Sequence, residues 1–327
     1  IKGASINLIT ASPSLLAMFI ADAEEKGIPL CELRGTIQND VLSGTYHRNI
    51  DINLSMRVAV DVIEYCGRHM PLWHPVSIAV RNTRDAGFTA IQEMAFGLAS
   101  AIAYTGWTLK RGVDIDEFAP RISFFLNAHN DFLEEVAKYR AMRRMYARLM
   151  KERFGAKDPR SMMMKFHVQT SGDSLTAQQP YNNIVRASLQ GLAAVMGGAQ
   201  SLHINSFDEA YAIPTADAAT LSLRTQQIIL NESGVTNTID PLGGSYFVET
   251  LTNKMEEEAW ALIEKIEKLG GMVEACNSGW IQSQVADAAW EYQKQVEKKE
   301  KFIVGVNLFV SEEKPQFDVF ELDPYFA

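Results

Sequence analysis

Hydrophobic and polar residues follow a repeating pattern, in which a short apolar run ends in polar residues and a longer helical stretch follows. The stretches between the runs carry apolar residues at three- and four-residue spacing, as in FLEEVAKYRAMRRMYARLM (residues 132–150). Short strands that alternate with amphipathic helices predict a parallel sheet with right-handed crossovers. The six runs are SINLIT (5–10), LRGTI (33–37), VSIAV (76–80), ISFFL (122–126), KFHV (165–168) and QSLHI (200–204).

Polar residues follow nearly every one of these runs, which bears on the fold class. An open doubly wound sheet gathers ligands at one switch point, whereas a (β/α)₈ barrel builds its site from the loops after all its strands. We therefore expect an α/β protein of the (β/α)₈ barrel type. Six units would be strands three to eight, with two strands missing before residue 1. The strands are expected to be nearly all apolar, because they would be buried on both faces.

The pattern changes after Glu249. Residues 251–300 are charged and helical throughout, and the tail IVGVNLFVSEEKPQFDVFELDPYF (303–326) is extended and punctuated by proline. We expect residues 1–250 to form the barrel, and residues 251–327 to form a helical segment and a linker toward a domain that is absent here.

Composition narrows the classes of function. The 327 residues carry a formal net charge of −9, so no nucleic-acid partner is expected, and the basic stretch KYRAMRRMYARLMKERF is interpreted as a solvated helix face. No 18-residue apolar run or signal peptide is visible, so no membrane association is expected. Three cysteines without paired or metal-type spacing indicate a reducing cytoplasm, and the histidines predict no protein-held metal.

Several polar residues near strand ends are candidates for function. Asp40, after LRGTI, is interpreted as a turn residue and helix N-cap, whereas Gln38 is better placed to face a ligand. His167 and His203 lie within strands, where a satisfied core histidine is at least as common as a functional one. The stretch VSIAVRNTRDAG (76–87) places charged and amide groups, Arg81 and Asn82 among them, after what the pattern predicts to be a buried strand.

Longer motifs give these clusters a family resemblance. The stretch FHVQTSGDSLTAQQPYNNIVRASLQGLAAVMGGAQSLHINSFDEAYAIPT (166–215), with GTIQND, DEFAPRISFF, NESG and IDPLGGSYFVETLT in the same order, resembles the adenosylcobalamin-dependent acyl-CoA mutases, whose best-known member is methylmalonyl-CoA mutase. The resemblance covers about residues 5–308. It implies a barrel that threads the CoA arm along its axis, carbon-skeleton isomerisation of an acyl-CoA, and the cofactor adenosylcobalamin. It also implies an oligomer and a cobalamin-binding subunit or domain, because the family's Asp-x-His-x-x-Gly motif is absent here.

The resemblance assigns roles residue by residue. Gln38 matches a substrate-contacting glutamine, and Arg48 stands where an arginine clamps a substrate carboxylate, although this loop is about three residues shorter and a surface arginine is the alternative. Lys165 replaces an arginine near the CoA arm. The other matched positions are His167, Gln169 and His203 for substrate, and Asp85, Gln200 and Glu232 for the cofactor.

The chain departs from the family at the segment VSIAVRNTRDAG. Arg81 occupies the place of a tyrosine that packs against the reacting groups, and Asn82 replaces a histidine that hydrogen-bonds the thioester carbonyl. Three alternatives follow: a mutase of altered specificity in which Arg81 and Asn82 are catalytic, an ordinary methylmalonyl-CoA mutase, or a non-catalytic paralogous subunit. In the first, the Asn82 amide can still donate to a carbonyl, and Arg81 could hold a carboxylate.

Overall fold

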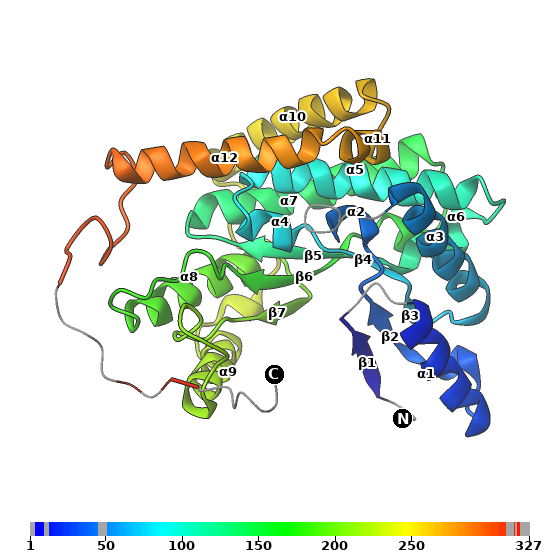
Figure 1. The fold of residues 1–327 in the computed structure, drawn as a ribbon, viewed down its shortest axis with the longest axis horizontal. Helices are drawn as coiled ribbons and strands as arrows, with labels where there is room; N and C mark the ends of the chain where they lie inside the picture. Colours follow the sequence, from blue (N-terminus) through cyan, green and yellow to red (C-terminus); the bar gives the residue numbers. More distant parts are fainter. Residues whose placement is uncertain (1–3, 10–12, 45–50, 312–316, 318, 321–327) are drawn as a thin grey trace.

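The computed structural model describes residues 4–9, 13–44, 51–311, 317 and 319–320, which form an α/β structure with parallel sheets (Figure 1). One sheet has the order β1-β2-β3 and the other the order β4-β5-β6-β7, and all pairings are parallel. The strands are β1 (Ser5–Leu8), β2 (Arg34–Ile37), β3 (Trp73–His74), β4 (Val76–Ile78), β5 (Ile122–Ala128), β6 (Lys165–Thr170) and β7 (Ser201–His203). The prediction of six strand units with helical crossovers is confirmed.

The two sheets meet at Pro75, between β3 and β4, and the predicted run VSIAV (76–80) covers only the second of these strands. Residues before the proline pair with β2 (Gly35 with Trp73), and residues after it pair with β5 (Val76 with Ile122). Proline has no N–H to give to a ladder, so it is found where pairing changes or ends. β3 and β4 therefore act as one strand that passes from one sheet to the next.

Helices connect the strands and cover the sheets. The helix starts follow local capping chemistry: Asp51, Asp131 and Ser245 each accept a hydrogen bond from a first-turn N–H, and Thr89 with Gln92 forms a capping box. The α-helices are α1 (Pro13–Glu25), α2 (Val41–Gly44), α3 (Ile52–His69), α4 (Arg81–Asp85), α5 (Ala90–Leu109), α6 (Ile115–Phe118), α7 (Phe132–Arg148), α8 (Asn182–Met196), α9 (Ala216–Asn231), α10 (Tyr246–Lys268), α11 (Met272–Asn277) and α12 (Trp280–Glu297). Short 3₁₀ or π turns span Leu30–Glu32, Ala119–Arg121, Leu149–Arg153, Pro159–Met162 and Val235–Asn237.

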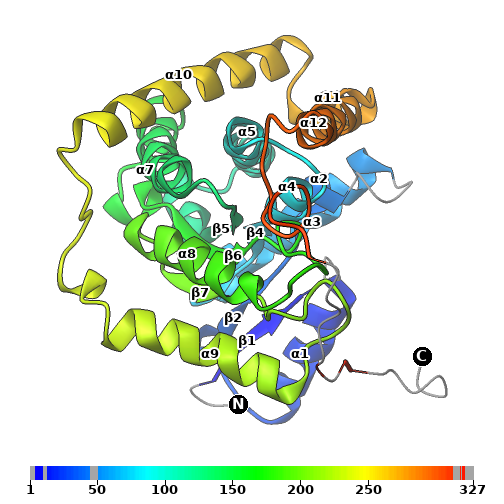
Figure 2. The ribbon, with the colours of Figure 1, turned by 90° about the vertical axis from the view of Figure 1, so that its left-hand side faces the viewer.

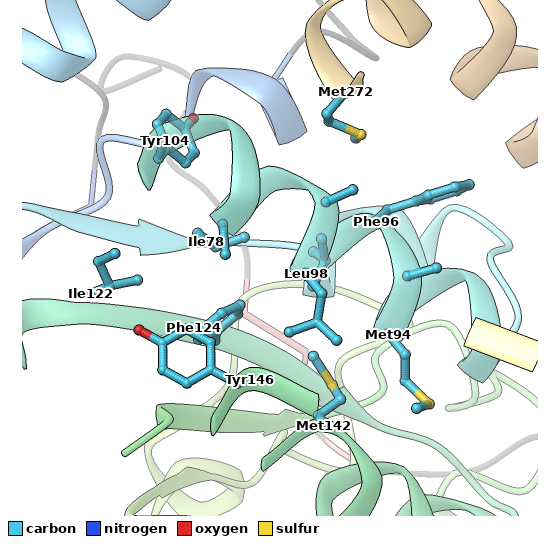
Figure 3. Packing of buried hydrophobic residues seen from close by; sticks show 14 of the residues in the cluster. Ile78, Met94, Phe96, Leu98, Tyr104, Ile122, Phe124, Met142, Tyr146 and Met272 are labelled. Atoms are coloured by element: carbon cyan, nitrogen blue, oxygen red, sulfur yellow. The ribbon is translucent and has the colours of Figure 1, made fainter. Parts of the chain in front are cut away.

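The main core lies between the four-stranded sheet and helices α5 and α7 (Figure 3). The ring of Phe124 on β5 meets that of Tyr146 on α7 edge-on at 5.5 Å between centroids. α10 to α12 form a further layer over α5 and α7 (Figures 1 and 2), and Ile263 and Met272 from this layer belong to the same core. Each fully buried Ile, Leu, Phe or Met side chain in this core stabilises the fold by about 1.5–3 kcal/mol. A smaller second core lies under α1 and the first sheet, around Leu16, Ile37, Cys66 and Trp73.

The expectation that the strands are apolar on both faces is wrong. On β5, Ile122, Phe124 and Leu126 are buried, whereas Ser123 and Phe125 between them are only partly buried. β6 alternates in the same way. In the described parts of the chain, helices therefore cover one face of these strands, and the opposite face, called the concave face below, can carry polar side chains.

Arg81 and Asn82 follow strand β4, as the sequence predicts, but the strand is shorter than the run VSIAV (76–80). β4 ends at Ile78, and both residues belong to the five-residue helix α4. Val80 already has helical dihedral angles, and its carbonyl accepts from Thr83 Oγ1 (2.6 Å) and the Arg84 N–H (3.1 Å). The polar run is thus a helical turn set on the end of a strand.

Candidate functional site

A cavity of about 450 Å³ opens on the concave face of the strands. Its lining comes from all six strand units or the residues next to them, so it follows the sheet rather than one loop. The register places side chains in rows across the sheet, since Ser123 pairs with Lys165 and Phe125 with His167. The polar lining residues are Ser5, Asn7, Thr36, Gln38, His74, Ser77, Ser123, Lys165, His167, Gln200 and Ser201.

Positive charge gathers where the strands begin. Arg34 and Lys165 are the first residues of β2 and β6, and Arg121 directly precedes β5. Burial and the charge of Arg121 and Arg160 lower the pKa of Lys165, and Arg160 and Arg34 act in the same direction on the pKa of Arg121. Lys165 Nζ donates to the carbonyl of Pro120. This edge can therefore attract anions in a chain that is acidic overall.

Neutral histidines occupy the middle of the concave face. His167 Nδ1 lies 2.8 Å from Ser201 Oγ, and its ring centroid is 5.0 Å from that of Phe125. Burial, with the charge of nearby His203 and Arg81, lowers the pKa of His167 to about 4. Burial also lowers the pKa of His74 to about 4, and its Nδ1 lies 2.9 Å from the carbonyl of Arg121. At neutral pH these rings offer hydrogen bonds without charge.

Arg81 lies over the carboxyl edge of the strands. Its Nη2 pairs with Asp85 Oδ2 at 2.9 Å, and its Nη1 donates to Asn82 Oδ1 at 3.3 Å. The guanidinium carbon is 5.8 Å from the centroid of the Phe125 ring. Beside it, Gln169 Nε2 donates to Asn205 Oδ1 (2.7 Å). Arg81 and partial burial both lower the pKa of His203, which pairs with Gln169 in the sheet register. The structure thus brings together Arg81, Asn82, Asp85, Gln169 and His203.

A second carboxylate stands close to Asp85. Ser171 Oγ lies 3.5 Å from Asp85 Oδ1 and donates to Asp173 Oδ1. Burial, chiefly, raises the pKa of Asp85 to about 7; Arg81 opposes that shift, and Asp173 adds to it. Asp173 Oδ2 is 3.8 Å from His129 Nε2, and burial lowers the pKa of His129 to about 3. A carboxyl with a pKa near 7 can take up or release a proton at physiological pH.

Asn127 links this edge to a buried cluster of charges. Its Nδ2 donates to Asp85 Oδ1 at 2.6 Å, and its backbone N–H donates to Glu93 Oε1 at 2.7 Å. Lys138 Nζ donates to Glu93 Oε2 and to the Asn127 carbonyl, both at 2.7 Å, and also to Glu135. The side chains of Glu93, Glu135 and Lys138 have no exposed surface. Charges this deep need fixed partners, so the cluster fixes the place of Asn127 and, through it, of Asp85.

Asp40 has the structural role that the sequence predicts. Its Oδ1 accepts from the N–H groups of Leu42 (3.2 Å) and Ser43 (3.3 Å), which begins α2. Its Oδ2 accepts from the N–H of Ala79 (2.7 Å), and the Tyr104 hydroxyl donates to Oδ1 (2.7 Å). The carboxylate therefore ties α2 to the turn that leads into α4.

Two predicted cofactor residues, Gln200 and Glu232, do not lie beside Asp85. Gln200 lines the cavity but directly precedes β7, at the opposite strand edge from Asp85, and its amide is bonded to the Phe166 N–H (2.7 Å) and the Gly198 carbonyl (2.9 Å). Glu232 is an exposed residue at the C-terminal end of α9 and lines none of the described cavities. Arg48 lies outside the described residues. Their roles stay predictions.

Sequence reasoning missed part of the site. Asn127 was visible only as a polar residue after an apolar run, and the basic edge of Arg34, Arg121 and Arg160 spreads over three distant segments. One signal was available: polar residues recur at every second position in KFHVQ (165–169), as Lys165, His167 and Gln169. That period of two is typical of a strand with one polar face.

Within the described parts of the chain, no cluster of three or more histidine, cysteine, aspartate or glutamate side chains is arranged to hold a metal. No helix there is long and apolar enough to cross a membrane. The three cysteines form no disulfide; Cys31 is exposed, and Cys66 and Cys276 are buried.

Comparison with known proteins places the chain. The profile of the family described as methylmalonyl-CoA mutase matches residues 3–326. The chain is 46% identical over 323 residues to the 2-hydroxyisobutanoyl-CoA mutase large subunit of Aquincola tertiaricarbonis. This match covers 97% of the chain and 57% of the relative. It is 45% identical to the methylmalonyl-CoA mutase of Rhizobium meliloti and 43% identical to the mitochondrial enzyme of Homo sapiens, each over 94% of this chain and 44% and 42% of the relative.

The chain thus spans about half the length of the curated relatives that it matches. The profile match nevertheless extends over nearly all of its residues, and the identities exceed 40%. The chain belongs to the methylmalonyl-CoA mutase family.

Proposed function

We propose that this chain is the acyl-CoA-binding part of an adenosylcobalamin-dependent acyl-CoA mutase, an isomerase that exchanges a hydrogen and an acyl-CoA group between neighbouring carbons. The main support for this proposal is the concave face of the sheets. In a (β/α)₈ barrel this face is ordinarily filled by bulky Val, Ile and Leu side chains. Here it bears small polar side chains around a cavity of about 450 Å³, which suits a long polar ligand lying along the strands.

The charge along the strands gives the ligand a direction. The basic edge of Arg34, Arg121, Arg160 and Lys165 suits the phosphates of CoA, because guanidinium and ammonium groups bind phosphate oxygens strongly. From Lys165 to Gln169 the strand advances about 13 Å. The thioester and acyl group would then lie near Gln38, His167 and the carboxyl edge. Neutral His167 can hold a carbonyl without adding charge, and Asn82 Nδ2 can donate to one.

The carboxyl edge also fits the adenosyl part of the cofactor. Ribose hydroxyls are hydrogen-bonded by carboxylates and amides, and Asp85, Gln169 and Asn205 supply both kinds of group there. We propose that Asp85 and Glu232 contact this part of the cofactor; Gln200 belongs with them only if its amide leaves its present partners. Adenosylcobalamin, when bound, supplies the radical chemistry. The chain's own residues bind and orient the substrate and exclude water.

The finer architecture follows from the open sheet edges. β1 and β7 each pair on one side only among the described strands. We propose that further strands pair with both edges, so that they and residues 1–250 together form a closed (β/α)₈ barrel. Residues 251–327 would then lead toward a cobalamin-binding domain or subunit, in an oligomer in the cytoplasm.

The test uses the full-length protein with its cobalamin-binding partner and adenosylcobalamin. Acyl-CoAs are added one at a time, and both product formation and the change in cofactor absorbance on cobalt–carbon cleavage are followed. Turnover of at least one acyl-CoA supports the proposal. Absence of both signals with every acyl-CoA would instead favour a non-catalytic paralogous subunit, the alternative suggested by Arg81 and Asn82.

A further inference from the structure

We infer that the acyl group handled at the carboxyl edge carries no charge, so that the substrate is a CoA ester of a monocarboxylic acid and not of a dicarboxylic acid. The inference rests on the proposed function and names the substrate class of the same site. It depends on how the charges around Arg81 are already matched.

The guanidinium of Arg81 is occupied by the protein itself. Nη2 is paired with Asp85 at 2.9 Å and Nη1 donates to Asn82 Oδ1 at 3.3 Å. Nε is buried without a partner among the described atoms, and only 16% of the side chain is exposed. A carboxylate clamp needs two neighbouring N–H groups that face the ligand. The remaining pair, Nε with the second N–H of Nη2, is not open to a ligand here, because Nε is buried.

In the described part of the chain, the charged groups next to Arg81 are mainly carboxylates. Glu209 also lies near it, since Glu209 Oε1 and Arg81 Nη2 lie 3.5 and 3.8 Å from the point where Gly172 would carry a Cβ. Asp173 stands behind Asp85, bridged to it by Ser171. Burial raises the pKa of both Asp85 and Glu209, although Arg81 opposes the shift. Negative charge is therefore already unfavourable at this edge before a substrate binds.

Among the residues that the structure describes, the other basic groups near this edge do not compensate. Arg84 faces Glu93 at 3.9 Å and Glu135 at 4.0 Å, and Lys301 lies over the ring of Tyr292 at 4.8 Å. The lowered pKa of His167 and of His203 keeps both rings neutral. A substrate carboxylate would therefore bring one more negative charge beside Asp85 and Glu209. A like charge about 6 Å away at an effective dielectric constant of about 20 weakens binding about 100-fold.

A comparison of two CoA esters tests the effect of a carboxylate on the acyl group. Methylmalonyl-CoA differs from 2-methylpropanoyl-CoA by one carboxylate in place of one methyl group. With the full-length protein, its cobalamin-binding partner and adenosylcobalamin, we expect kcat/KM for 2-methylpropanoyl-CoA to exceed that for methylmalonyl-CoA by about 100-fold. Isothermal titration of the same protein gives the ratio of the two dissociation constants whether or not turnover occurs, and we expect the same preference in it.

Charge-neutralising variants test the cause. Glu209→Gln and Asp85→Asn should each narrow the preference about tenfold or more. Glu134→Gln is the matched control, because it also removes a partly buried carboxylate with a raised pKa. The charged neighbours of Glu134 do not include Arg81; they are Glu135, Arg84, Asp131 and Lys138. This variant should leave the preference between the two CoA esters unchanged.

Equal or tighter binding of methylmalonyl-CoA overturns the inference. If that binding is lost in Arg48→Ala, the carboxylate clamp lies on Arg48, and the inference fails in the same way. Failure of the proposed function looks different, because no acyl-CoA is then turned over and no cofactor signal appears. In that case the ratio of the two dissociation constants still decides the charge question.

Discussion

Lys138→Met tests whether the buried charge cluster stabilises the fold as the geometry indicates. The variant keeps the length of the side chain but removes the ammonium group that contacts Glu93 and Glu135, both fully buried. At 2.7 Å and an effective dielectric constant of about 20, one such contact attracts by about 6 kcal/mol before desolvation is subtracted. Loss of one partner from a buried ion pair generally costs about 3–5 kcal/mol, because a charge is left without compensation.

We expect urea unfolding to show that loss in the free energy of unfolding and thermal unfolding to show a drop of roughly 10 °C. The control is Lys254→Met, since Lys254 is 71% exposed and lies 3.8 Å from Glu258 on the surface of α10; it should cost at most about 0.5 kcal/mol. The double variant Lys138→Met with Glu135→Gln should recover part of the stability. A loss below about 1 kcal/mol for Lys138→Met would refute the reasoning, because it would mean that the cluster is solvated or rearranges freely.

Three further changes probe other contacts. Tyr104→Phe removes a hydroxyl that donates to the buried carboxylate of Asp40 and accepts from two backbone N–H groups, so urea unfolding should show a loss of about 2–3 kcal/mol. Gly87→Ala should cost more than Gly112→Ala in thermal unfolding, since both glycines have positive φ but only the Cβ at Gly87 would lie 2.6 Å from a side chain of α12. Burial raises the pKa of Asp85 from 3.8 to about 7, so the stability that the protonated group provides is complete below about pH 4 and is lost as the pH rises through 7. The free energy of unfolding of Asp85→Asn should therefore fall less between pH 5 and pH 8 than that of the unmodified protein, and an equal fall would contradict the raised pKa.

The strand units were predictable because each is bounded by polar residues and followed by a helical period. The polar concave face was not predicted, although KFHVQ alternates, because the runs were interpreted as strands buried on both faces. Which face the helices cover is decided by contacts between segments far apart in sequence, such as Phe124 with Tyr146. The N-cap at Asp40 could be predicted, because a cap depends only on residues three positions apart.

The part of the candidate site that lies in one short segment was predictable. The part that depends on contacts between distant segments was not. Resemblance to a family pointed to Arg81, Asn82 and Asp85 in one short segment. It did not indicate that Asn127 would bind Asp85 across 42 residues of chain, or that Glu93 and Lys138 would fix Asn127. Helix α4 was missed because Arg-Asn-Thr-Arg-Asp has no apolar periodicity. Its helical turn begins at Val80, which has helical dihedral angles and whose carbonyl accepts from Thr83 and Arg84.

The break at Pro75 divides the molecule into regions of unequal resistance to opening. The segment with β1, β2 and α1 has its own small core, and it joins the larger one through the interrupted strand and through α3, whose residues Cys66 and Ile63 belong to different cores. Regions with few buried contacts open at lower free energy than the whole protein. Amide hydrogens of residues 5–37 should therefore exchange with solvent as one cooperative unit, well before those of β5 and β6. The fold would then have a stable half that holds the charge cluster and a half that can detach and re-form without disturbing it.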